Sequence, residues 1–190
     1  AALPEDVLGL VREEFRDPDG RWVGTSGRPR TVPYNTDTFS ESDIPEDVFA
    51  FPEQSRFEDR MGWAPSYGSF QAFVTAMRIL NGPEATREWL QGMLDLGVQS
   101  YSDEFSIVQA IADGEIAAGF TNHYYIQRVL DGRPEAPLAT AFTRGDAGAV
   151  FNVAGAAVVD TADDTEMATN FVRHLLSAEA QEYFATTTFE

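Results

Sequence analysis

Two adjacent tyrosines, Tyr124 and Tyr125, stand in the stretch TNHYYIQ, just after the apolar run IAAGF. Neighbouring side chains point to opposite faces of a strand and lie about 100° apart on a helix, so both hydroxyls converge only at the end of an element. Because the pKa of a free phenol is about 10, deprotonation near neutral pH requires a strongly charged metal, and ferric iron qualifies. The residues alone leave open a hydrogen-bonding pair or two half-buried aromatics at a sheet edge.

Two further stretches have residue types suited to an anion. In SYGSFQAFV, Ser66 to Val74, a turn of small residues leads into a helix, whose first N–H groups and dipole favour negative charge. The alternative is an ordinary serine-capped helix. Arg28 and Arg30 in TSGRPR have the donor geometry to clamp an anion or carboxylate, or they are surface charges.

Several kinds of chemistry lack the residues they need. The chain has no cysteine and only two histidines, which argues against thiol nucleophiles, thiolate zinc sites and histidine-based triads. Neither a glycine-rich phosphate motif nor a nucleophile elbow is present. A carboxylate-based hydrolase needs two converging acids, and Glu104 is the one acid near the candidate site. We therefore expect no enzyme activity.

The charge balance limits the partners. The formal net charge is −18, from 31 acidic and 13 basic residues, and every basic residue is arginine. Such a surface disfavours nucleic acid and anionic membranes, and its lack of lysine resembles proteins of salt-loving organisms. No stretch approaches the roughly 20 apolar residues that span a bilayer, so we expect no direct membrane insertion by this chain.

Strands alternate with helices along the chain, which predicts an α/β fold with a mainly parallel sheet flanked by helices. Asn122 is expected to cap the helix that contains the tyrosines, and a loop is expected from Gly132 to Gly148. The expected strands are 21–37, MGWAP, EIAAGF and AVFNVAGAAVV, and the expected helices are LPEDVLGLVREEF, FQAFVTAMRIL, PEATREWLQGMLDL, SIVQAIADG, NHYYIQRVLDG, DTEMATNFVRHLLS and AEAQEYFATTT.

Taken together, these stretches resemble the ferric-iron-binding proteins of ABC importers, which have the type II periplasmic-binding-protein fold. The resemblance runs nearly end to end, and its specific part is the adjacent tyrosines in an N-x-Y-Y setting. The other segments that carry it are FRDPDGRWVGTSGRPR, VPYNTD, GWAPSYGSFQAFVTAMR, DGEIAAGFTNHYYIQRVL, GDAGAVFNVAGAAVV and LLSAEAQEYFATTTFE.

The resemblance implies two lobes that close over one Fe(III) ion and deliver it to a membrane permease. Residues 35–147 would form the complete second lobe, and residues 1–34 and 148–190 would belong to the first lobe and its crossing strands. The implied metal ligands are Tyr124 and Tyr125. A synergistic anion, phosphate or carbonate, would be held by Tyr67, Gly68, Ser69 and Asn122, with Arg28 or Arg30 as a further contact.

Three departures from the family pattern are visible. The family's histidine and carboxylate ligands lie upstream of Ala1, so we expect an N-terminally truncated chain. The anion turn carries the bulky Tyr67, and Glu104 stands where the family often has an asparagine that touches the anion. A carboxylate there repels phosphate. We hypothesise that Tyr67 and Glu104 partly replace the external anion; the alternative is that Glu104 points to solvent.

The resemblance therefore implies an extracytoplasmic iron receptor of an ABC importer, secreted or lipid-anchored. Phe70 stands where a three-tyrosine subset of the family has its extra ligand, which places this chain with the two-tyrosine kind. The alternative is a receptor of the same fold for an anion or small organic solute without metal.

Overall fold

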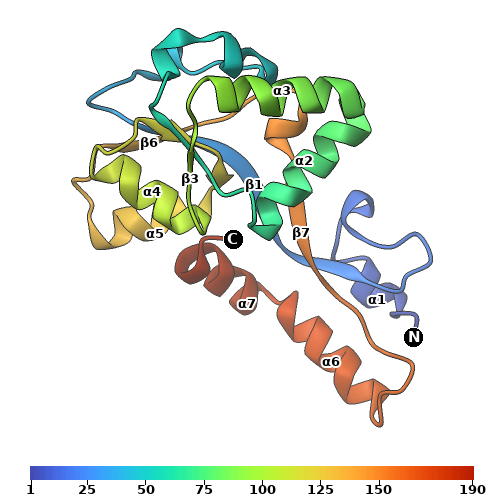
Figure 1. Ribbon diagram of the computed structural model, residues 1–190. Helices are drawn as coiled ribbons and strands as arrows, with labels where there is room; N and C mark the ends of the chain where they lie inside the picture. Colours follow the sequence, from blue (N-terminus) through green and yellow to red (C-terminus); the bar gives the residue numbers. More distant parts are fainter. The chain divides into compact units, whose positions relative to one another are not determined.

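The computed structural model describes residues 1–190 and divides into two compact units (Figure 1). The terminal unit consists of Ala1–Arg28 and Phe151–Glu190, and the central unit of Pro29–Val150. The long strand β1 (Val23–Asn35) gives its first residues to the terminal unit and the rest to the central unit. The lobe predicted at residues 35–147 lies within the central unit.

The central unit has short strands and four longer helices. Its elements after β1 are β2 (Met61–Trp63), α2 (Gly68–Asn81), α3 (Pro83–Asp95), β3 (Gln99–Ser100), α4 (Glu104–Ala112), β4 (Ala118–Gly119), β5 (Thr121–Asn122), α5 (Tyr124–Gly132) and β6 (Leu138–Ala141). It also has the 3₁₀ helices η2 (Glu41–Asp43), η3 (Val48–Glu53), η4 (Ser55–Phe57) and η5 (Ala147–Ala149). No helix of the chain is long and apolar enough to cross a membrane.

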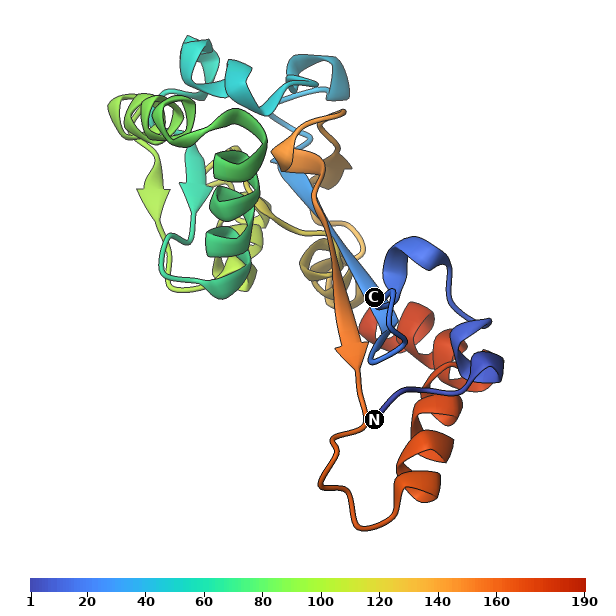
Figure 2. The same ribbon diagram turned by 90° about the vertical axis from the view of Figure 1, so that its right-hand side faces the viewer.

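The sheet of the central unit is mixed, with strand order β3-β2-β4-β1-β5 and with β6 also paired to β1. Strand β2 runs parallel to β3 and β4, because helical crossovers return the chain to the same edge each time. The prediction of a parallel sheet is correct for β2, β3 and β4. Strand β1 pairs antiparallel with β4, β5 and β6. Figures 1 and 2 show α4 and α5 on one side of the short strands and α2 and α3 on the other.

Three local predictions were wrong. The stretch LPEDVLGLVREEF forms two short pieces, the α-helix Glu5–Leu8 and the 3₁₀ helix Glu13–Phe15, rather than one amphipathic helix. The range 132–148 contains β6 and η5 rather than a continuous loop. The sequence of β6, LATA, lacks the run of β-branched and aromatic residues that signals a strand. The strand is stabilised by its pairing with β1 instead. Asn122 is not the N-cap of α5, because it lies in β5 opposite Arg30 and His123 takes the cap position.

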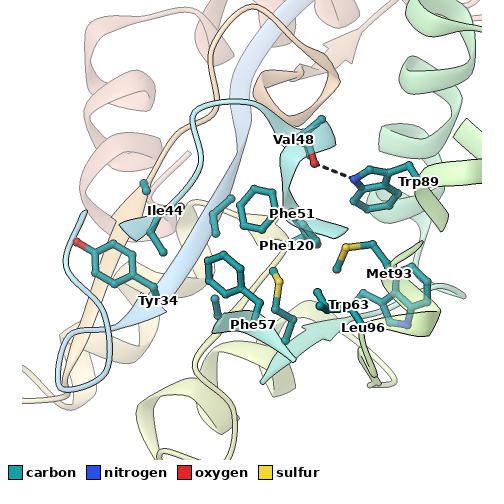
Figure 3. Packing of buried hydrophobic residues seen from close by; sticks show 14 of the residues in the cluster. Tyr34, Ile44, Val48, Phe51, Phe57, Trp63, Trp89, Met93, Leu96 and Phe120 are labelled. Carbon is teal, nitrogen blue, oxygen red and sulfur yellow. Dashed lines mark hydrogen bonds between the residues drawn. The ribbon is translucent and has the colours of Figure 1, made fainter. Parts of the chain in front are cut away.

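Aromatic side chains form the core of the central unit (Figure 3). Phe120, next to β4, has its ring centroid 5.1 Å from that of Phe51 and 5.5 Å from that of Trp89. The buried indole N–H of Trp89 donates to the carbonyl of Val48 at 2.8 Å, so burial leaves it no unpaired donor. This packing holds α2 and α3 against the sheet.

The terminal unit has a much smaller core. Its elements besides β1 are α1 (Glu5–Leu8), η1 (Glu13–Phe15), β7 (Phe151–Ala156), α6 (Thr165–Leu175), α7 (Ala178–Tyr183) and the π-helical turn η6 (Phe184–Thr188). The buried cluster is formed by Leu3, Val7, Val23, Val158 and Val172. On α6, Met167 is 69% exposed and Phe171 is 60% exposed, so one apolar stripe of this helix has no cover in the chain.

Candidate functional site

The predicted tyrosine pair begins helix α5. Tyr124 and Tyr125 are the first two residues of the helix, both are buried, and their ring centroids lie 4.2 Å apart. The preceding strand β5 ends at Asn122, so the backbone turns at His123 and brings the two phenols together. This is the arrangement that the sequence required for convergence, and α5 starts without a side-chain cap.

A third phenol joins them from another helix. Tyr67 is the N-cap residue of α2, and its hydroxyl lies 2.6 Å from the hydroxyl of Tyr125. Three phenols from two helix starts therefore occupy one region of the central unit. Tyr67 was predicted in the anion-binding turn, and the structure places its hydroxyl against the tyrosine pair.

Burial sets the protonation of this cluster. It raises the pKa of Tyr125 far above that of a free phenol, and the hydrogen bonds with Tyr124 and Tyr67 raise the pKa further. Without a cation Tyr125 is therefore a neutral hydrogen-bonding group. A cation that binds here has to displace phenolic protons, so its charge must be high.

Two neighbours of the phenols were not predicted. The guanidinium of Arg128 lies 4.9 Å from the ring centroid of Tyr124 and 5.8 Å from that of Tyr125. Arg128 follows Tyr124 by four residues, so the helical spacing was a usable signal. Phe105 has its ring centroid 6.3 Å from that of Tyr125, and only the tertiary packing of α4 against α5 brings it there.

Glu104 points inward, which rules out the solvent-facing alternative. Its side chain is fully buried, and Oε1 accepts hydrogen bonds from Nη1 of Arg30 at 2.7 Å and Oγ of Ser69 at 2.5 Å. Its Oε2 accepts the backbone N–H of Asn122 at 2.8 Å. The structure therefore brings together four of the predicted residues, including Ser69 from the anion turn.

Arg30, rather than Arg28, is the arginine of this cluster. Arg30 is 1% exposed, and its guanidinium lies 5.1 Å from the ring centroid of Phe73. Nη2 of Arg30 and Oδ1 of Asn122 are buried without a hydrogen-bond partner in the chain. Arg28 belongs to the terminal unit. Nη2 of Arg30 and Oδ1 of Asn122 are thus an unused donor and an unused acceptor inside the cluster.

Gly68 opens helix α2 between Tyr67 and Ser69. A Cβ atom added at this position would meet nothing within 4 Å, so the backbone of the turn faces open space. The first N–H groups of α2 also lack a side-chain cap. The turn therefore has the accessible backbone donors expected of an anion-binding helix start.

The chemistry of the donor set is that of oxygen. The chain contains no group of three or more histidine, cysteine, aspartate or glutamate side chains arranged to hold a metal. The phenol oxygens of Tyr67, Tyr124 and Tyr125 are therefore the candidate ligands in the central unit. As phenolates they suit a hard cation, and as phenols they donate to an oxyanion or a carbonyl.

Comparison with known proteins places the chain in a family. A model of the bacterial extracellular solute-binding proteins matches residues 13–189. The chain belongs to this family. A solved member with a similar fold is iron-bound HitA from Pseudomonas aeruginosa, with a TM-score of 0.89 and 29% identity, covering 98% of this chain and 61% of HitA. The predicted type II periplasmic-binding-protein fold is confirmed.

Curated relatives of this family member include ferric-iron-binding proteins. The major ferric iron-binding protein of Neisseria meningitidis serogroup A is 34% identical over 163 residues, which cover 84% of this chain and 49% of that protein. The Fe(3+)-binding periplasmic protein of Serratia marcescens is 27% identical over 193 residues, which cover 98% of this chain and 55% of that protein. The chain thus spans about half the length of these relatives, and the resemblance found in the sequence is confirmed.

Proposed function

We propose that this chain is part of an extracytoplasmic receptor that captures Fe(III) for an ABC importer and delivers it to the permease, without catalysing a reaction. The observation that carries the proposal is the meeting of three phenols, with the hydroxyls of Tyr67 and Tyr125 2.6 Å apart and the ring of Tyr124 beside that of Tyr125. Tyr124 and Tyr125 are buried, and Tyr67 is half-buried. The names of the ferric-iron-binding relatives support it.

The chemistry of these phenols selects the cargo. Tyr124 and Tyr125 would bind as phenolates, and iron binding would release their protons. A divalent ion has less charge with which to displace protons that burial and hydrogen bonding hold on Tyr125. Ferric iron combines high charge with a preference for oxygen ligands, so the site discriminates by the cost of deprotonation.

The proposal extends to the lobes of the receptor. In this proposal residues 35–147 form one lobe of the receptor, and residues 1–34 and 148–190 belong to the other lobe. Two lobes of such a receptor close around the solute by a hinge motion. The residues that the family resemblance assigns to an oxyanion all lie in the central unit: Asn122, Gly68, Ser69, Tyr67 and Arg30.

A second candidate is a receptor of the same fold for an anion or small organic solute, without metal. The raised pKa of Tyr125 favours it, because a neutral phenol is a hydrogen-bond donor. The uncapped starts of α2 and α5 also suit a carboxylate or phosphate group.

A ferric titration followed by visible absorbance separates the two. Iron bound by tyrosinate has a visible charge-transfer band, which hydrogen-bonding phenols lack. With iron supplied as a weak carboxylate chelate, we expect a band in the wild-type chain and its loss in Tyr124→Phe and Tyr125→Phe. Tyr34→Phe is the matched control, because Tyr34 is equally buried but lies in the hydrophobic core.

The proposal has two ways to fail. A wild-type chain that stays colourless at saturating iron favours the metal-free receptor. A band that persists when both Tyr124 and Tyr125 are replaced by phenylalanine places the iron elsewhere.

A further inference from the structure

The carboxylate of Glu104 is enclosed by hydrogen-bond donors from three other elements. Arg30 lies on β1, Ser69 in the first turn of α2 and Asn122 on β5, while Glu104 itself opens α4. Both carboxylate oxygens are engaged, at distances of 2.5 to 2.8 Å. A buried carboxylate without such partners would be strongly destabilising, so the donors and the acid form one unit.

The donors are those that proteins use for a free oxyanion. A guanidinium, a hydroxyl at the start of a long helix and a backbone N–H together match the shape and charge of phosphate or carbonate. Here the negative group they surround is covalently attached to the chain. The charge of Arg30 is therefore compensated before any solute arrives.

The pocket that Arg30, Ser69 and Asn122 form around the Glu104 carboxylate is next to the phenols in the sequence. Ser69 follows Tyr67 by two residues, and Asn122 precedes Tyr124 by two. Phe105, next to Glu104, has its ring centroid 6.3 Å from that of Tyr125. The donors of Glu104 and the phenols are therefore held by the same segments of the chain.

We infer that Glu104 is a built-in anion. It occupies the place between Arg30, Ser69 and Asn122 where a free oxyanion would bind, so this chain binds its solute without a separate phosphate or carbonate. The iron part of the inference rests on the proposed function, whereas the exclusion of oxyanions is a property of the chain without iron.

Phosphate titration of the iron-free chain by calorimetry tests the exclusion directly. We expect no measurable phosphate binding to the wild type and measurable binding to Glu104→Ala, where the three donors are released. Glu88→Ala is the matched control, since it removes an exposed carboxylate from α3. Binding of phosphate to the wild type, or none to a folded Glu104→Ala, overturns the inference.

A second pair of variants guards against loss of folding. Glu104→Asn keeps a shorter polar side chain but leaves the charge of Arg30 uncompensated, so it should also gain phosphate binding. The double variant Arg30→Met with Glu104→Met removes both charges and should bind no phosphate. Equal phosphate binding by Glu104→Asn and the double variant contradicts a pocket built around Arg30.

The ferric titration, repeated with and without phosphate, tests the iron part. We expect the wild-type affinity for iron to change less than about twofold, and that of Glu104→Ala to rise at least about tenfold with phosphate. A charge-transfer band that forms in the wild type only with phosphate overturns the inference while the proposed function stands. If all variants stay colourless but phosphate binds as expected, the proposed function is wrong. The inference that Glu104 occupies the pocket then still stands.

Discussion

The central and terminal units of this chain bury very different amounts of apolar surface. The core of the central unit has 20 buried residues, rich in phenylalanine and tryptophan, whereas that of the terminal unit has five small aliphatic ones. Large apolar side chains that are more than half exposed occur in both units, with Val159, Met167 and Phe171 in the terminal one. We infer that the central unit resists local opening and that the terminal unit opens at lower free energy.

The candidate site follows this division. All three phenols and the Glu104 cluster lie in the central unit, at the starts of α2, α4 and α5. A binding group has to be held within a fraction of an ångström, which a densely packed aromatic core achieves. The more densely packed central unit therefore also contains the candidate site.

The largest expected effect comes from removing core volume. Phe57→Ala in the central unit should lower the free energy of unfolding by about 3–5 kcal/mol, because Phe57 is fully buried against Phe39 and Phe51. Val172→Ala in the terminal unit should cost about 1.5 kcal/mol, for two buried carbon atoms. Urea unfolding followed by tryptophan fluorescence gives both values. Equal losses would contradict the contrast between the cores.

Ion pairs offer a second comparison between the central and terminal units. Arg30→Met leaves Glu104 buried without its cation and should cost about 3–5 kcal/mol. Arg173→Met breaks the exposed pair with Asp6 in the terminal unit and should cost less than about 1 kcal/mol. Thermal unfolding of the two variants measures the difference, and high salt should change only the second. A small effect of Arg30→Met would show that the buried pair is not tightly coupled.

Much of this arrangement was predictable from local sequence. Asn81 and Gly82 mark the end of α2, and Pro83 marks the start of α3. The spacing of apolar residues within each stretch predicted that both are helices. The tyrosine pair and the turn at Tyr67 were recognisable by residue type. The hydrogen-bond donors around Glu104 could not be recognised in the same way. They lie 18 to 74 residues away in the sequence and meet Glu104 only in the folded chain. Strand β6 was missed for a similar reason, since its pairing with β1 is non-local.

The helix N-caps give the smallest effect and a dependence on pH. The backbone N–H of Ser106 is the main cause that lowers the pKa of Asp103, helped by the hydroxyls of Ser102 and Ser106. The stabilisation by this cap is complete above the pKa of an unfolded aspartate and is lost as the pH falls through the lowered pKa of the folded state.

Asp103→Asn isolates this pH dependence, because asparagine caps a helix without titrating. We expect the free energy of unfolding of the wild type to fall relative to Asp103→Asn as the pH drops below about 4. Asp103→Ala should cost about 1 kcal/mol at neutral pH, as should Asp164→Ala at the start of α6. Identical pH profiles of the wild type and Asp103→Asn would argue against the lowered pKa.

An iron-edge anomalous difference map from crystals grown with a ferric carboxylate chelate would show directly whether the tyrosine pair binds iron. We expect one strong peak within bonding distance of the Tyr124 and Tyr125 hydroxyl oxygens, with Glu104 still bound to Arg30. No peak at the tyrosine pair, or a peak bound only by surface carboxylates, would contradict the assignment of these phenols as an iron site.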